Sequence, residues 1–249
     1  MANRAAKGRR GTDRKRGPGV SRVRETRLAW TADIAYAVGL AATDGSLART
    51  GRHVSFVSKD LEQVESFLRC VNRPGARIRK DGGAYRAYFG DVELYRWLAA
   101  AGLTPRKSLT LGGLWLPEKL FLHGVRGLLD GDGSIAHYVH APNRRKYPNY
   151  RYRRLYVRFY SASRYHLLWL RAQLHKRLGI RGALLRLQRE AKHDLFELRY
   201  AKYASITLLN QLYEDPASPR LLRKWSIWEA FKKQPVTTRP YRRHRPAPE

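Results

Sequence analysis

The chain is poor in cysteine, in acidic residues and in long apolar runs. Its 249 residues include one cysteine, Cys70, which excludes an internal disulfide and fits a reducing, intracellular compartment. With this single cysteine and eight scattered histidines, no zinc-ligand spacing occurs. No apolar run approaches the roughly 18 residues that span a bilayer, and residues 1–16 lack the apolar stretch of a secretory signal. We therefore expect no membrane partner.

Acidic residues are scarce beside basic ones. Lysine and arginine number 50 and aspartate and glutamate 20, which gives a net charge of +30. This excess favours a polyanionic partner, most simply nucleic acid, and argues against a neutral metabolic enzyme. Residues 1–28 carry +8 and residues 232–249 carry +5, which leaves +17 on residues 29–231. Both ends lack apolar periodicity and are predicted to be disordered basic arms; whether they follow phosphates or are solvated tails stays open.

Between these arms, helical and strand-like segments alternate, and the same order occurs twice. In the first half, helices are expected over 31–42, 59–72 and 92–101, and strands over 46–50, 53–58, 76–80 and 84–89. In the second half, helices are expected over 117–129, 163–178 and 203–213, and strands over 134–140, 150–160, 183–189 and 194–200. An internal duplication explains the repetition, with one unit over 29–112 and a second over 113–231. The second unit is longer mainly between strands, where loops tolerate insertions.

Each unit carries the same short motif where its first helix ends. Residues 37–45 read AVGLAATDG, and residues 125–133 read VRGLLDGDG. Both resemble the LAGLIDADG motif of the homing endonuclease family. The second copy matches better, because the first has Ala42 where the motif's first acidic residue stands. Since each copy is followed by the same strand and helix order in a basic chain, the resemblance covers roughly residues 29–231.

The resemblance implies an α+β fold of two pseudo-symmetric αββαββα units, each with a curved antiparallel sheet, joined by their packed motif helices. The residues support such packing, because Gly39 and Ala42 on one helix, and Gly124 and Gly127 on the other, form faces without bulk. Close packing would bring the motif aspartates together at two helix C-termini. Carboxylates are unfavourable there and cations favourable, because the dipole end is negative. For one isolated Asp-Gly, a simple helix-ending turn would be the alternative.

Two carboxylates beside a polyanion suggest phosphodiester hydrolysis with a divalent metal, and hard oxygen ligands suit Mg²⁺. By resemblance, Asp44 and Asp132 each bind metal and together cleave both DNA strands across the minor groove, leaving short 3′ overhangs. Mn²⁺ or Ca²⁺ are expected to substitute for Mg²⁺ in binding. The resemblance gives the backbone carbonyls of Thr43 and Gly131 as the companion ligands.

The family also places one basic residue of each unit near the scissile phosphates. Lys107 lies in Arg-Lys-Ser and Lys224 in Arg-Lys-Trp-Ser, which are similar contexts in the two units. The expected roles are to orient water and to stabilise charge in the transition state. In so basic a chain, either residue could instead be a surface lysine.

The strands are expected to read the DNA, because a β-ribbon fits the major groove, where base edges are distinguishable. Strand alternation predicts which side chains lie on the face away from the helices. Some of them are expected to contact only phosphates. The predicted DNA-facing residues are His53, Ser55, Arg77, Arg79, Arg86, Arg154, Tyr156, Arg158, Arg186, Gln188, Glu197 and Arg199.

These observations favour a monomeric, site-specific double-strand DNA endonuclease whose two units cover the halves of a long pseudo-palindromic site. Two alternatives use the same scaffold. One is a maturase that binds an intron RNA, and the other is a non-catalytic DNA-binding protein, to which Ala42 is favourable.

Overall fold

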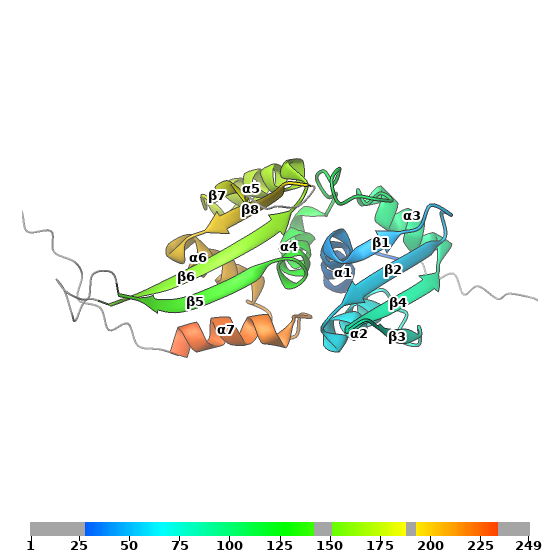
Figure 1. Cartoon of the computed structure of the whole chain (residues 1–249), viewed down its shortest axis with the longest axis horizontal. Coiled ribbons are helices and arrows are strands. Elements are labelled where there is room, and N and C mark those ends of the chain that lie inside the picture. The colour runs from blue at the N-terminus through cyan, green and yellow to red at the C-terminus, as the bar shows by residue number, and fades with distance from the viewer. Residues whose placement is uncertain (1–27, 142–150, 188–192, 234–249) are drawn as a thin grey trace, which may run out of the picture.

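A computed structural model describes residues 28–141, 151–187 and 193–233 of the chain. It has an α+β fold of two units, each built around a four-stranded antiparallel sheet (Figure 1). The first unit consists of α1 (Ala32–Thr43), β1 (Gly45–Leu47), β2 (His53–Ser58), α2 (Leu61–Cys70), β3 (Ile78–Asp81), β4 (Ala84–Gly90) and α3 (Val92–Ala100). The second consists of η1 (Glu118–Leu120), α4 (Phe121–Asp130), β5 (Ser134–His140), β6 (Tyr152–Ser161), α5 (Arg164–Leu178), β7 (Ala183–Leu187), β8 (Leu195–Tyr200), α6 (Lys202–Leu212) and α7 (Leu222–Lys233).

The predicted order of helix, two strands, helix, two strands and helix is confirmed in both units, with three local differences. The first strand ends at Leu47 rather than at residue 50, because the chain turns through Gly51, whose φ of +74° suits glycine. The predicted helix over 117–129 begins as the 3₁₀ turn η1 and becomes α-helical only at Phe121. Helix α7 is absent from the predicted order, although Trp225 and Trp228 lie in a helix-like apolar pattern; it buries Lys224, Trp228 and Phe231.

The two sheets have the same topology. Their strand orders are β1-β2-β4-β3 and β5-β6-β8-β7, and all neighbouring strands are antiparallel. Helices α2 and α3 pack on the first sheet, and α5 and α6 pack on the second (Figure 1). Along β6, Leu155, Val157 and Phe159 are buried against these helices, and the alternate side chains lie on the opposite face. That opposite face of each sheet is called its outer face below.

The motif helices α1 and α4 lie side by side between the two sheets (Figure 1). A Cβ atom on Gly39 would lie 2.1 Å from the Gly124 carbonyl oxygen and 2.9 Å from the Gly127 Cα. A Cβ atom on Gly127 would lie 2.2 Å from the Tyr36 carbonyl oxygen. The predicted close approach of the two helices is therefore confirmed, and it depends on glycine, because any side chain here would meet backbone.

Several predictions fall outside the described residues. They include nearly all of the two basic arms, 1–28 and 232–249, and Gln188. In the part of the chain that the structure covers, no helix is long and apolar enough to cross a membrane.

Candidate active site

The two motif aspartates lie where α1 and α4 end. Thr31 caps the start of α1 by accepting a hydrogen bond from the Ile34 amide, and Asp44 is the residue that ends the helix. Gly131 ends α4, and Asp132 follows it directly. A Cβ atom on Gly131 would lie 1.9 Å from Thr43 Oγ1 and 3.0 Å from Asp44 Oδ2. The helix ends are thus in contact, as the glycine pattern predicted.

The electrostatics of the site reflect this proximity. Burial and the charge of Asp132 raise the pKa of Asp44 to about 6, although a hydrogen bond from Thr43 Oγ1 and the nearby lysines oppose the shift. Burial also raises the pKa of Asp132, against the lowering effect of Lys107 and Lys224. Two partly desolvated carboxylates that repel each other form a site that a cation would stabilise.

Lys107 and Lys224 are both buried at this site rather than on the surface. The Lys107 Nζ donates to the carbonyl oxygens of Thr43, at 3.2 Å, and Gly45, at 2.6 Å. The Lys224 Nζ donates to three consecutive carbonyls, those of Leu129, Asp130 and Gly131, at 2.7–2.8 Å. Each lysine therefore holds the C-terminal end of the motif helix of its own unit.

The lysine contacts are compatible with the predicted companion ligands. The carbonyl oxygens of Thr43 and Gly131 each accept one hydrogen bond from a lysine, and a carbonyl oxygen has a second lone pair. No group of three or more His, Cys, Asp or Glu side chains that could hold a metal occurs among the described residues. The donors available are thus two carboxylates and two carbonyls. This all-oxygen set fits Mg²⁺, which usually keeps several water ligands.

A pocket of about 460 Å³ opens beside Asp132. Its walls include Thr43 and Asp132 from the motif ends, Lys107, and Tyr160 and Ser161 from the end of β6. Apolar side chains such as Leu111 and Leu195 complete the lining, so the pocket presents one lysine and one aspartate on a mixed surface.

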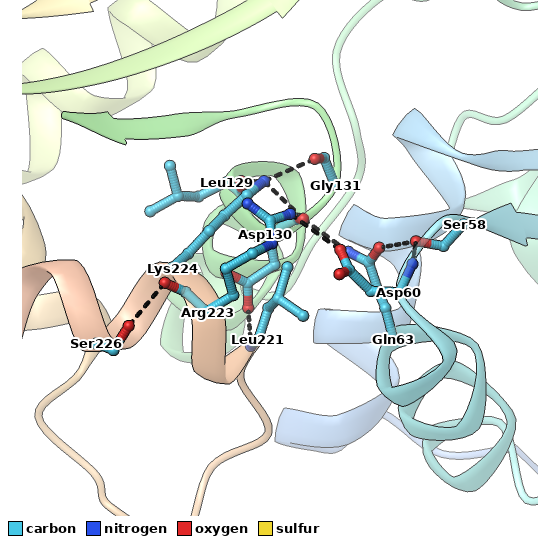
Figure 2. A network of polar contacts seen from close by, with 10 residues as sticks. All are labelled: Ser58, Asp60, Gln63, Leu129, Asp130, Gly131, Leu221, Arg223, Lys224 and Ser226. Atoms are coloured by element: carbon cyan, nitrogen blue, oxygen red, sulfur yellow. Dashed lines mark hydrogen bonds and ion pairs between the residues drawn. The ribbon is translucent and has the colours of Figure 1, made fainter. Parts of the chain in front are cut away.

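Asp130 is the acidic motif residue whose equivalent in the first copy is Ala42. Its side chain is buried and accepts hydrogen bonds from other parts of the fold. Its Oδ2 accepts hydrogen bonds from Tyr36 Oη and from the Leu221 amide, both at 2.9 Å. Its carbonyl oxygen accepts from Gln63 Nε2 at 2.7 Å as well as from Lys224 (Figure 2). Burial raises the pKa of Asp130 to about 6, although these hydrogen bonds and Lys224 oppose the shift.

Sequence reasoning missed the contacts that tie α2 of the first unit to α4 and α7 of the second. Besides the Gln63 hydrogen bond to Asp130 in α4, Asp60 at the start of α2 forms an ion pair with Arg223 in α7, with 2.9 Å between Oδ2 and Nη2 (Figure 2). Asp60 and Arg223 are 163 residues apart in the chain, so no local pattern could have paired them.

The outer faces of the two sheets hold most of the residues predicted to contact DNA. In the first unit, Ser55 pairs with Tyr88, and Arg79 pairs with Arg86, so these side chains share the outer face with His53. The neighbouring Arg77 is exposed just before β3. In the second unit, the register places Arg154, Tyr156, Arg158 and Arg199 on the outer face. Tyr88, Tyr138 and Tyr152 also lie there and were not predicted.

The face prediction needs correction for Arg186. Arg186 is opposite Phe196, and Phe196 is opposite Ser161, which places Arg186 on the helix side of the sheet, where it pairs with Asp194 at 2.8 Å. Because a loop separates β7 from β8, the pairing of Arg186 with Phe196 cannot be obtained by counting residues along the chain. Glu197 does lie on the outer face, but it is only 4% exposed and is paired with two arginines. It is therefore not free to accept a hydrogen bond from cytosine.

No family model matches the chain, and no curated protein matches its sequence. Its fold is nevertheless found in solved structures of low sequence identity. A variant of the homing endonuclease I-DmoI is 14% identical with a TM-score of 0.55, over 80% of this chain and 97% of that one. The I-LtrWI LAGLIDADG homing endonuclease bound to target DNA is 11% identical with a TM-score of 0.53, over 81% and 88%.

Full-length DUF199/WhiA from Thermotoga maritima is 12% identical with a TM-score of 0.50, over 86% of this chain. The chain spans 65% of the length of that protein. The glycine-packed motif helices, the paired sheets and these similarities agree: the chain has the two-unit fold of the LAGLIDADG homing endonucleases.

Proposed function

We propose that this protein is a site-specific double-strand DNA endonuclease that hydrolyses phosphodiesters with a divalent metal, Mg²⁺ in the first place. The observation that carries the proposal is the contact between two equivalent helix ends, each with one aspartate and one buried lysine. Such a site lies between two sheets whose outer faces are rich in arginine and tyrosine. Anion-binding surfaces on both sides of two cation-attracting carboxylates suit cleavage of a duplex across its minor groove.

The similar structures support a DNA substrate and a metal. I-LtrWI was solved on target DNA, I-DmoI with DNA and Ca, and a variant of I-DmoI with its target DNA in the presence of Mn. When bound, the metal would supply Lewis-acid stabilisation of the charge that develops on phosphate oxygens. Asp44 and Asp132 would hold it, with the Thr43 and Gly131 carbonyls as companion ligands.

The protein's own residues divide the remaining work. The two sheets bind the halves of a long, pseudo-palindromic duplex and fix its register against the motif ends. Lys107 retains one N–H that has no partner among the described residues and borders the pocket, so it would donate to a phosphate oxygen. The two internally repeated units make a second copy of the chain unnecessary, and we propose that the monomer acts on both strands.

The test is cleavage of a randomised double-stranded DNA library with Mg²⁺, followed by mapping of the cut ends. We expect a defined site with short 3′ overhangs. Asp44→Asn or Asp132→Asn should abolish double-strand cleavage while site binding persists. Glu229→Gln removes a carboxylate that pairs with Lys232 in α7 and should cleave like the wild type. Undiminished cutting by the double aspartate variant would refute the proposal.

A second candidate is a DNA-binding protein that does not cut. It is favoured by Lys224, whose three N–H donors are all used by backbone carbonyls, and by Ala42 in the first motif. Sequence-specific binding that is unchanged by removal of Mg²⁺, without cleavage, would support it. Tight binding to a structured intron RNA without DNA cutting would instead favour the maturase.

A further inference from the structure

Glu197 is a buried acid on a surface that is rich in arginine and tyrosine. It lies in β8 on the outer face of the second sheet. The Arg199 Nε donates a hydrogen bond to Glu197 Oε1, and the Arg158 Nε lies 3.5 Å from the same oxygen. The Glu197 carboxylate therefore accepts a hydrogen bond from Arg199 and forms an ion pair with Arg158, whose Nε makes no hydrogen bond among the described residues.

The strand register explains why an acid is needed here. Arg158 in β6 is directly opposite Arg199 in β8, and like charges in that arrangement destabilise a sheet. Glu197 precedes Arg199 by two residues, so it shares the face and lies diagonal to Arg158. Its charge compensates the repulsion between the two arginines.

Tyr156 completes the arrangement from the other side. The Cζ atom of Arg158 lies 5.1 Å from the centre of the Tyr156 ring, and that of Arg199 lies 6.0 Å from it. Both guanidinium groups are thus held by a carboxylate and an aromatic ring. Since an arginine side chain loses much rotamer freedom when it binds, holding it beforehand lowers that cost.

The chemistry of the held groups indicates what they bind. Because both ion pairs with Glu197 are made at Nε, each guanidinium keeps its two Nη atoms as a planar fork of donors. Such a fork matches the O6 and N7 acceptors of guanine in the major groove, and no other base presents this pair. The first unit has no equivalent, because its Arg86 pairs at 3.2 Å with Asp81, a side chain that is 60% exposed.

We propose that Glu197 is a positioning residue that fixes Arg158 and Arg199 to read guanine in the half-site covered by the second unit. This rests on the duplex binding in the proposed function and does not depend on cleavage. Guanine is the expected base because its O6 and N7 acceptors match the two Nη donors of each arginine. Glu197 restricts the orientations that the two guanidinium groups can adopt.

The experiment is selection of bound sequences from a randomised double-stranded DNA library in EDTA, with the full chain. Wild type should select guanine at one or two adjacent base pairs of one half-site. Glu197→Gln keeps the shape and removes the charge, and Arg199→Lys keeps the charge and removes the fork. Both should lower the preference for guanine roughly tenfold or more at those base pairs and nowhere else. Asp194→Asn, which removes the partner of Arg186 on the opposite face, is the matched control and should select like wild type.

An unchanged guanine preference in folded Glu197→Gln would overturn the proposal, as would equal weakening at every base pair, which indicates a phosphate contact. If Glu197→Gln fails to fold, as judged by thermal melting, Arg199→Lys and Arg158→Lys carry the same test. A wild type that selects a site and never cuts refutes the nuclease alone. A wild type that selects no sequence refutes both.

Discussion

Lys107 and Lys224 hold equivalent positions at the ends of the two motif helices but use their donors differently. The Lys224 Nζ donates to three backbone carbonyls, which uses every N–H of an ammonium group, whereas the Lys107 Nζ donates to two. Burial lowers the pKa of both groups, that of Lys224 to about 8. Lys107 therefore keeps one N–H that can donate to a substrate, whereas Lys224 keeps none.

This difference predicts opposite rankings for stability and activity. Lys224→Met removes a donor from three carbonyls, of which, among the described residues, only that of Asp130 keeps another, from Gln63. It should lower the free energy of unfolding by roughly 2–4 kcal/mol, against about 1–3 kcal/mol for Lys107→Met. Lys107→Met should slow DNA cleavage more, by roughly 10²–10³-fold, because it removes the donor that borders the pocket. Urea unfolding and a plasmid cleavage assay measure the two effects. Lys119→Met, at an exposed lysine, is the control, and equal effects of the two buried lysines on both measurements would contradict the asymmetry.

The interface of the motif helices predicts strong sensitivity to a single methyl group. Gly127→Ala places a Cβ atom 2.2 Å from the Tyr36 carbonyl oxygen and 2.9 Å from the Leu40 amide nitrogen, and backbone cannot rotate away. We expect a loss of about 3 kcal/mol in the free energy of unfolding. Gly112→Ala, which would meet nothing within 4 Å, should change stability by less than about 0.5 kcal/mol. Comparable stability of the two variants in urea would show that α1 and α4 do not pack as described.

The hydrogen bonds of Asp130 predict different effects for Asp130→Asn, which removes the charge, and Asp130→Ala, which also removes the acceptor. Its Oδ2 accepts both strong hydrogen bonds, whereas Oδ1 accepts only a long one of 3.5 Å from Tyr213 Oη. Asparagine can therefore keep its oxygen in place of Oδ2, and Asp130→Asn should stay within about 1 kcal/mol of wild type. Asp130→Ala leaves the Tyr36 hydroxyl and the Leu221 amide unpaired and should lose roughly 2–4 kcal/mol. Chemical denaturation of both variants at pH 7 checks this, and an equally severe Asp130→Asn would mean that the charge itself is required.

The raised pKa of Asp44 predicts a pH-dependent stability difference in metal-free protein. Burial and Asp132 raise its pKa from 3.8 to about 6, so the folded state holds the proton more tightly than the unfolded state. The folding free energy attributable to Asp44 is therefore lost as pH rises from about 4 to about 6. Asp44→Asn cannot ionise, so its stability relative to wild type should increase across that interval and level off above it. Urea unfolding in EDTA between pH 4 and pH 8 measures the difference, and a constant difference would contradict the shift.

The helices and strands of this fold were accessible from the sequence because burial imposes a period on the chain. Leu155, Val157 and Phe159 alternate in β6, and the turn glycines separate the strands. The burial of Lys224 in α7 was not accessible, since it is balanced by contacts 93–95 residues away. Arg186 was placed on the wrong face because strand pairing, rather than a count along the chain, sets its side.

The sequence by itself determined the duplication, the two motif aspartates, and the glycines that let α1 and α4 touch, because these depend on residue type and local spacing. Only the tertiary structure decided how the polar groups are shared. It directs all three N–H groups of the Lys224 ammonium to backbone carbonyls and makes the Asp130 carboxylate a buried hydrogen-bond acceptor. It also joins Asp60 to Arg223 and places Glu197 beside two arginines. Apart from the neighbours Glu197 and Arg199, each of these pairs joins partners that are distant in the chain, and packing, not the local sequence, determines which partners meet.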